Sequence, residues 1–151
     1  MFCSILVILL NIFYLFPPSG NGNIVVEISG IKPLKGDLYV ALYNSSSSYL
    51  ILDSACQKIQ VPVTDDTVAI VFSNVENGEY AIAVFHDENG NAEMDRHFYG
   101  IPKEGYGFSN NAKGKFGPPK FNDAKFTFSG SYTARIKIIN NIFSNGKHKK
   151  K

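Results

Sequence analysis

The sequence predicts an all-β protein: a seven-stranded antiparallel sandwich of immunoglobulin-like or transthyretin-like type, with a long irregular insert before the last two strands. Three observations support this. Apolar and polar residues alternate along short segments, turn-forming residues separate those segments, and no helical periodicity occurs after residue 22. Each strand then has one hydrophobic face, which a second sheet must cover, and a small closed barrel is the alternative.

The chain of 151 residues has room for one domain. Residues 1–20 hold an apolar stretch that is too short to span a bilayer comfortably and ends in a Pro-Pro-Ser-Gly turn, which predicts a secretory signal peptide. An uncleaved N-terminal anchor is the alternative. The β-sandwich is expected over 23–140, with its insert at 87–123, and 141–151 is expected to be a disordered basic tail. After cleavage Cys56 is the only cysteine, which excludes an internal disulfide.

The charge distribution argues against nucleic-acid binding. Fifteen basic residues exceed thirteen acidic ones, but four of the lysines belong to the tail, so the body carries eleven basic residues against thirteen acidic. A basic tail is most often a solvated end. No clustered basic face is interleaved with stacking aromatic residues, so no nucleic-acid partner is expected.

The first two strands are expected at 24–28 and 38–42, where apolar residues occupy every second position. Pro33 and Gly36 predict the turn between them, and the serine run Ser45 to Ser48 predicts a loop. A third strand at 59–63 contains Pro62, which cannot donate a ladder hydrogen bond and therefore predicts a sheet edge.

The remaining strands are expected at 68–72, 80–86, 126–128 and 132–138. Both faces of 68–72 are apolar, which predicts a central position in a sheet. Asn77 and Gly78 form the strongest hairpin signal in the chain, because this pair accepts the positive φ of a tight turn.

The insert at 87–123 is unusually long for a segment without regular structure, and such loops are usually functional or disordered. Its six aromatic residues argue against disorder; they are Phe98, Tyr99, Tyr106, Phe108, Phe116 and Phe121. We expect the insert to pack a small core of its own over one end of the sandwich.

The start of the insert, D-E-N-G-N-A-E-M-D at 87–95, predicts a calcium loop. Side-chain oxygens at the first, third, fifth and ninth places, with a backbone carbonyl at the seventh, follow the spacing of loops that wrap one hard cation. The candidate ligands are Asp87, Asn89, Asn91, Glu93 and Asp95, and Glu104 or Asp123 could complete the set.

Two departures predict weak calcium binding. Ala92 stands where a positive φ is usual, at a cost of about 1 kcal/mol relative to glycine. Phe98 stands where a bidentate glutamate would complete the site, so we expect a dissociation constant of roughly 10⁻⁴ to 10⁻³ M. The alternative is an Asx-rich turn, in which the same side chains cap backbone amides without an ion.

No other residue pattern predicts a metal centre or an active site. His86 and His97 flank the loop without a third ligand at zinc spacing, and His86 is expected to be a hydrogen-bonded core residue. A hydrolase acting on envelope glycans or peptides could use Ser109 with His86 and Asp87, or Glu88 with Glu104. No strained-turn motif frames the serine, however, so no catalytic residues are assigned and an enzyme is not expected.

Three blocks of this sequence resemble a known bacterial family. They are A-V-F-H-D-E-N-G-N-A-E-M-D at 83–95, G-I-P-K-E-G-Y-G-F-S-N-N-A at 100–112 and G-P-P-K-F-N-D-A-K-F at 117–126. The sequence is similar in these blocks to the family catalogued as domain of unknown function 2141, whose members often have glycine where this chain has Ala92. The resemblance implies a β-sandwich in a secreted, periplasmic or cell-envelope protein. It implies no activity.

Besides a hydrolase, which is not expected, two functions remain open. The insert could present Tyr99, Tyr106, Phe108 and Phe116 to an envelope or extracellular partner such as a glycan or a peptide. Alternatively, it could only seal the sandwich, as part of a structural accessory domain. No membrane span is expected after signal cleavage, calcium is the only cofactor considered, and the oligomeric state stays open.

Overall fold

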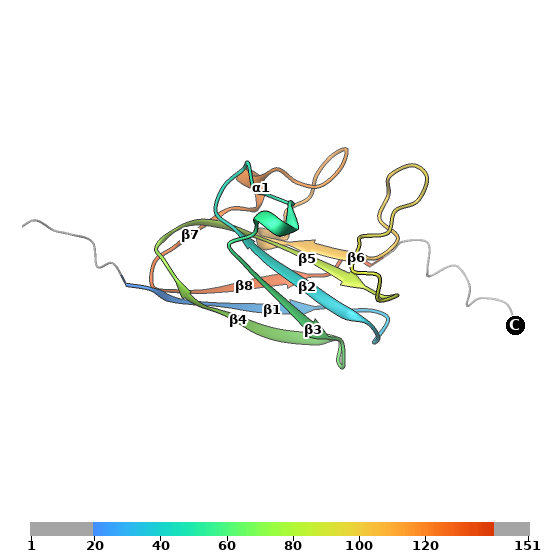
Figure 1. The fold of residues 1–151 in the computed structure, drawn as a ribbon, viewed down its shortest axis with the longest axis horizontal. Helices are drawn as coiled ribbons and strands as arrows, with labels where there is room; N and C mark the ends of the chain where they lie inside the picture. Colours follow the sequence, from blue (N-terminus) through green and yellow to red (C-terminus); the bar gives the residue numbers. More distant parts are fainter. Residues whose placement is uncertain (1–19, 141–151) are drawn as a thin grey trace, which may run out of the picture.

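The computed structural model describes residues 20–140 as two β-sheets that pack face to face (Figure 1). One sheet has the order β4-β1-β8 and the other the order β3-β2-β5-β6, with β7 also paired to β5. The strands are β1 (Gly22–Ser29), β2 (Asp37–Tyr43), β3 (Gln57–Pro62), β4 (Thr67–Val75), β5 (Gly78–Asp87), β6 (Gly105–Phe108), β7 (Phe126–Phe128) and β8 (Ser131–Lys137). The expected tail and all but the last residue of the expected signal peptide lie outside the described residues.

The prediction of seven antiparallel strands requires two corrections. The described residues form eight strands, and the additional one, β6, lies within the insert that was expected to be irregular. Moreover, β1 and β8 pair in parallel, with Ile24 opposite Tyr132 and Ile28 opposite Ile136. A parallel pair needs a long connection, and here the whole second sheet separates the two strands in the sequence.

Two further predictions about strand positions were wrong, whereas one was right. β4 is an edge strand and not a central one, and Val71 on its outer face is half exposed. Asn77 and Gly78 do not close a hairpin, because β4 and β5 belong to different sheets and the connection crosses between them. β3, which contains Pro62, lies at a sheet edge as predicted.

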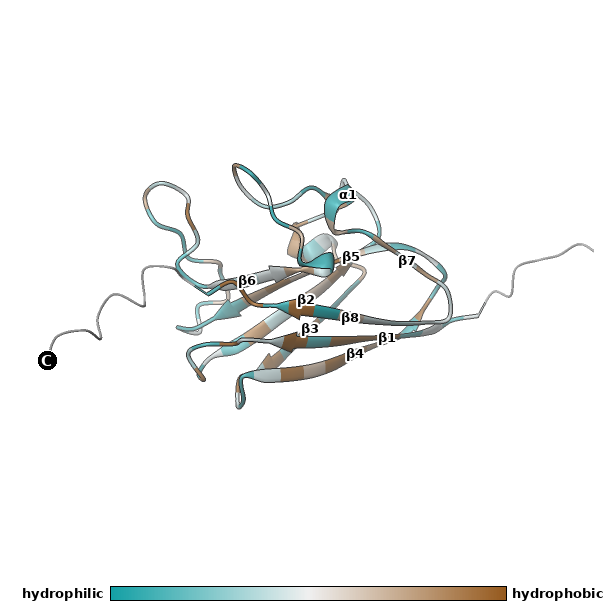
Figure 2. Ribbon diagram, turned by 180° about the vertical axis from the view of Figure 1, so that it is seen from behind, coloured by the Kyte–Doolittle hydropathy of each residue, from teal (hydrophilic) through white to brown (hydrophobic). Residues whose placement is uncertain are grey.

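The main core lies between the sheets and follows the predicted alternation. Ile24, Val26 and Ile28 of β1 are fully buried, as are Leu38, Val40 and Leu42 of β2. In Figure 2 hydrophobic positions alternate with hydrophilic ones along the strands. Burial of a side chain of this size typically contributes about 1.5–3 kcal/mol, so this interface supplies most of the driving force for folding.

Glycines explain the strand that the sequence did not reveal. A Cβ on Gly105 would lie 2.8 Å from Ile138 Cγ2, and one on Gly107 would lie 2.7 Å from Ile136 Cγ2. The inner face of β6 therefore has no room for side chains, and its outer face carries Tyr106 and Phe108. Without apolar side chains on its inner face, β6 lacks the pattern that predicts a strand.

The second half of the insert covers part of the outer face of the β2-β5 sheet. Here Phe108, Phe121 and Ala124 pack with Tyr43 and other residues of the sheet in a second apolar cluster. The insert was expected to form a core of its own over one end of the sandwich, but it shares this cluster with the outer face of the sheet and leaves Phe98, Tyr99 and Phe116 exposed. The short helix α1 (Phe121–Ala124) and two 3₁₀ turns, η1 (Leu52–Ser54) and η2 (Ser109–Asn111), lie around it. Within residues 20–140 no helix is long and apolar enough to cross a membrane.

Buried Ser109 joins the insert to the sheet. Its Oγ accepts a hydrogen bond from the backbone N–H of Ile82 at 2.9 Å and donates to the backbone carbonyl of Ala124 at 2.5 Å. This hydroxyl thus satisfies polar groups of β5 and α1 that would otherwise be buried without a partner.

Replacing Phe121 by alanine should lower the free energy of unfolding by about 3–5 kcal/mol, because the ring is buried in the second cluster. Phe116→Ala is the matched control: it removes the same side chain from a fully exposed position and should change stability by no more than about 0.5 kcal/mol. Urea denaturation measures both. Equal effects of the two substitutions would contradict the assignment of Phe121 to a core.

Candidate functional site

The loop after β5 is organised around the carboxylate of Asp87, which is buried. Its Oδ1 accepts hydrogen bonds from the backbone N–H groups of Asn89 (3.3 Å), Gly90 (2.7 Å) and Asn91 (3.3 Å). Its Oδ2 accepts from the N–H of Ala92 at 2.8 Å. Four consecutive amides therefore converge on one carboxylate, and the chain turns tightly around it.

The other candidate calcium ligands extend the same arrangement. Asn89 Oδ1 accepts from the N–H of Asn91 at 3.0 Å, and Asn91 Oδ1 accepts from the N–H of Glu93 at 2.9 Å. Asn89 Nδ2 donates to Asp95 Oδ2 at 2.6 Å. The loop thus contains the Asx turns of the alternative interpretation.

Ala92 adopts the left-handed conformation that the loop spacing predicted, with φ at 60°. The hydrogen bond from its N–H to Asp87 Oδ2 holds it there. A non-glycine residue in this region costs about 1–2 kcal/mol, so the carboxylate offsets a strained backbone at this point.

Glu104 closes the loop from its far end. This buried carboxylate accepts from the N–H of Glu88 through Oε1 at 2.9 Å and from the N–H of Asp95 through Oε2 at 3.1 Å. Asp87 and Glu104 therefore hold the beginning and the end of the same segment. Sequence reasoning named Glu104 only as an additional ion ligand or as a catalytic acid, and it did not anticipate this role.

Calcium binding stays a prediction. Within residues 20–140 no three or more His, Cys, Asp or Glu side chains gather as a metal-binding group. Asp123, the other carboxylate considered as a ligand, instead accepts from the N–H of Lys120 at 3.0 Å, where it caps α1.

The two histidines occupy different environments. His86 is fully buried on the inner face of β5, and its Nε2 lies 2.7 Å from the carbonyl oxygen of Lys35. This matches the prediction of a hydrogen-bonded core histidine. His97 is partly exposed in the loop that follows Asp95, and its backbone N–H donates to the carbonyl of Ile101 at 2.8 Å.

The residues considered for hydrolysis are not assembled into a catalytic arrangement. Ser109 is hydrogen-bonded to Ile82, which lies four residues along β5 from His86, or about 13 Å at the rise of a strand. Strand alternation also directs His86 and Asp87 to opposite faces. Glu88 and Glu104 are neighbours, but both oxygens of Glu104 hold backbone amides.

A groove of about 780 Å³ lies on the outer face of the second sheet. Its floor is formed by β2, β5 and β6, and its walls come from residues 92–102 on one side and 114–118 on the other, with Leu50 and Leu52 at one end. Figure 1 shows the two wall segments as loops that rise from the same side of the sheet. The volume falls in the range of small-ligand sites.

A row of aromatic rings crosses the floor of this groove. Tyr39 and Phe85 are paired across β2 and β5, and their rings stack with centroids 4.7 Å apart and an interplanar angle of 4°. Tyr106 is paired with Phe85 on the other side. Ala41 and Ala83 beside them leave the space above the sheet open.

All four aromatic residues predicted to contact a partner line this groove. Tyr99 and Phe116 are almost completely exposed, Tyr106 is partly exposed, and Phe108 is mostly buried in the second cluster. Sequence reasoning missed Tyr39 and Phe85. The alternation of their strands placed both residues on the solvent-facing side of the sheet. An aromatic residue on that side of each of two strands was the signal that could have revealed the groove.

Asp87→Ala should lower the free energy of unfolding by about 2–4 kcal/mol, because it removes the buried acceptor that four successive backbone amides share. Asp87→Asn should cost less, since one oxygen remains. Glu93→Ala, at an exposed position of the same loop, is the control and should change little. Urea denaturation measures these variants. A free energy of unfolding for Asp87→Ala equal to that of the control would show that the carboxylate does not organise the loop.

Glu88 should make stability depend on pH. Burial raises the pKa of its carboxyl above the ordinary 4.5, and Glu104 adds to this, whereas His86 and Lys35 oppose it. The folded state then binds the proton more tightly, so the Glu88 contribution to stability is present below pH 4.5 and is lost as pH rises through the raised pKa. As pH rises through this range, the melting temperature of Glu88→Gln should therefore increase relative to that of the wild type. A difference in melting temperature between the two proteins that does not change with pH would contradict the raised pKa.

The comparisons with known proteins yield one match. A family model described as an uncharacterised protein conserved in bacteria (DUF2141) matches residues 26–136. No curated protein and no solved structure matches the chain. The matched range covers β1 to β8 nearly in full, together with the Asp87 loop and both walls of the groove, and it confirms the resemblance noted in the sequence. The chain therefore belongs to this bacterial family.

Proposed function

We propose that the protein is a secreted or envelope-associated binding module, without catalytic activity, whose ligand occupies the groove above β2, β5 and β6. The observation that carries this proposal is the aromatic floor between two raised walls. Outer faces of antiparallel sheets commonly face water and carry polar residues. A row of partly exposed rings at the base of a groove is instead suited to hold a ligand.

The chemistry of the groove favours a neutral saccharide segment. Ring faces and edges of Tyr39, Phe85 and Tyr106 offer apolar contact, and two of these rings carry hydroxyl groups. The rim carries Glu93 and Arg96, which can hydrogen-bond to hydroxyl groups. A ligand with an apolar face and a polar edge would use both parts, and a sugar ring has this character.

The fold type and a second candidate function also belong to this proposal. We propose a sandwich of immunoglobulin-like or transthyretin-like type, supported by two facing sheets and by short strands linked across them. A purely structural accessory role is the second candidate. It is favoured by the second apolar cluster, where Phe108 and Phe121 seal part of the outer face.

Weak calcium binding by the Asp87 loop is retained as part of the proposal. Asp87 Oδ1 already accepts three amide hydrogen bonds, but Oδ2 accepts only the one from Ala92 and keeps a second lone pair for an ion. Millimolar calcium added to metal-stripped protein should raise the melting temperature of the wild type and leave that of Asp87→Asn unchanged. The absence of any shift up to about 10 mM, well above the expected affinity range, would exclude the site.

Ala83→Phe should abolish ligand binding, because the added ring would fill the floor of the groove. Saturation-transfer NMR with neutral oligosaccharides and short peptides measures this, and Val71→Phe on the outer face of the other sheet is the control. We expect saccharide signals from the wild type and the control only. Signals from peptides alone would show that the ligand is a peptide and not a saccharide. Saccharide signals that persist in Ala83→Phe would show that binding occurs outside the groove.

A further inference from the structure

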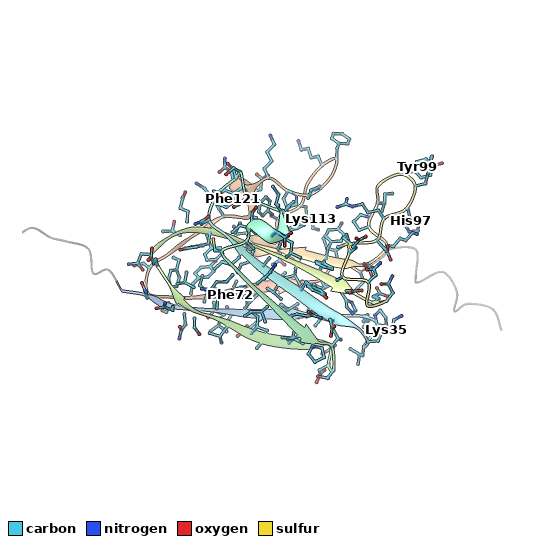
Figure 3. All side chains as sticks on the ribbon, in the orientation of Figure 1. Lys35, Phe72, His97, Tyr99, Lys113 and Phe121 are labelled. Carbon is cyan, nitrogen blue, oxygen red and sulfur yellow. The ribbon has the colours of Figure 1, made fainter. Side chains whose placement is uncertain are left out.

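The loops that flank the groove end in aromatic side chains that are almost fully exposed, and the rings of Phe98 and Tyr99 contact each other edge to face with centroids 5.4 Å apart. Phe98, Tyr99 and Phe116 are 97%, 86% and 103% exposed. Scattered exposed hydrophobic residues are normal, but three large aromatic residues at the tips of two adjacent loops form an interaction surface. Figure 3 shows Tyr99 at the outer end of its loop, directed away from the sheets.

The backbone itself holds these side chains outward. In the first loop the N–H of Gly100 donates to the carbonyl of His97 at 2.8 Å, so Phe98 and Tyr99 occupy the middle of a closed turn. In the second loop Gly114 and Gly117 approach so closely that a Cβ on Gly114 would lie 1.9 Å from the carbonyl oxygen of Gly117. Lys115 and Phe116 project between them.

The same two loops concentrate positive charge. Residues 96–103 and 112–120 contain five exposed basic residues and no acidic one; the five are Arg96, Lys103, Lys113, Lys115 and Lys120. The rest of the described chain carries all thirteen acidic residues and only six basic ones. Within residues 20–140, none of the five takes part in the ion pairs, which involve Lys58, Lys125 and Arg135. The two loops are therefore basic segments of an otherwise acidic domain, and Glu93, Asp95 and Glu104 border the first of them.

We propose that these two loops dock the protein on an anionic lipid bilayer. Aromatic side chains on projecting turns enter the interfacial layer, where rings of this kind are favoured. The surrounding lysines and the arginine lie at the level of the lipid phosphates and are attracted by the negative surface. Glu93, Asp95 and Glu104 lie at the base of the first loop, so the attraction is local to the basic residues of the two loops.

Docking on the bilayer and ligand binding in the groove involve the same two loops, but docking does not require a bound ligand. The groove opens between the two loops, so a docked molecule has the mouth of its groove at the bilayer surface. Loss of ligand binding in Ala83→Phe should leave docking unchanged. The two proposals can therefore fail separately.

Tryptophan reporters test the insertion directly, because the full chain contains no tryptophan. Phe98→Trp and Phe116→Trp should each shift their emission to the blue with vesicles of phosphatidylcholine and phosphatidylglycerol, and much less with phosphatidylcholine alone. Val71→Trp, half exposed on the opposite sheet, is the matched reporter and should not shift. Because each reporter senses its own position, attachment through either end of the chain would not imitate the result.

The charge requirement is tested by vesicle co-sedimentation. Lys113→Gln with Lys115→Gln should weaken binding to the anionic vesicles roughly thirty-fold, from about a fivefold contribution per lysine at such a surface. Lys32→Gln with Lys35→Gln, in the β1-β2 connection, removes the same charge and should have little effect. No blue shift at either loop, an equal shift at position 71, or equal losses in the two lysine variants would overturn the proposal.

Discussion

The carboxylate of Asp87 is the interaction on which the candidate site depends. It ends β5, an interior strand that pairs with β2, β6 and β7, and it accepts hydrogen bonds from four successive backbone amides. Charge-assisted hydrogen bonds of this kind are stronger than those between neutral groups. The direction in which the chain leaves the sheet is thereby fixed, and the first wall of the groove begins from a rigid point.

Glu104 completes this constraint and connects it to the sandwich. Its two oxygens hold amides at Glu88 and Asp95, so the segment between them leaves and re-enters the sheet at neighbouring positions. Directly after Glu104 the chain forms β6, where glycines allow close contact with Ile136 and Ile138. The wall loop is therefore anchored by two buried carboxylates and by a strand that can lie only where the core leaves room.

The sequence predicted the parts that depend on local pattern. Alternation located most strands, Pro62 identified an edge, and the oxygen spacing at Asp87 identified a tight turn with a positive φ at Ala92. Relations between distant segments were not accessible in this way. The parallel pairing of β1 with β8 and the central role of Glu104 arise from residues far apart in the chain. β6 was missed because its inner face consists of glycine, and the aromatic floor was missed because it joins Tyr39 and Phe85 from separate strands.

Amide hydrogen exchange at Gly90 and Ala92 tests the central claim most directly. Both residues lie in a surface loop outside every strand, and a Cβ added to Gly90 would meet no atom within 4 Å. If Asp87 organises the loop, both amides should exchange far more slowly than an unstructured chain, and this protection should disappear in Asp87→Ala while the amides of β2 remain protected. Exchange of Gly90 and Ala92 in the wild type at the rate of an unstructured peptide would contradict the account.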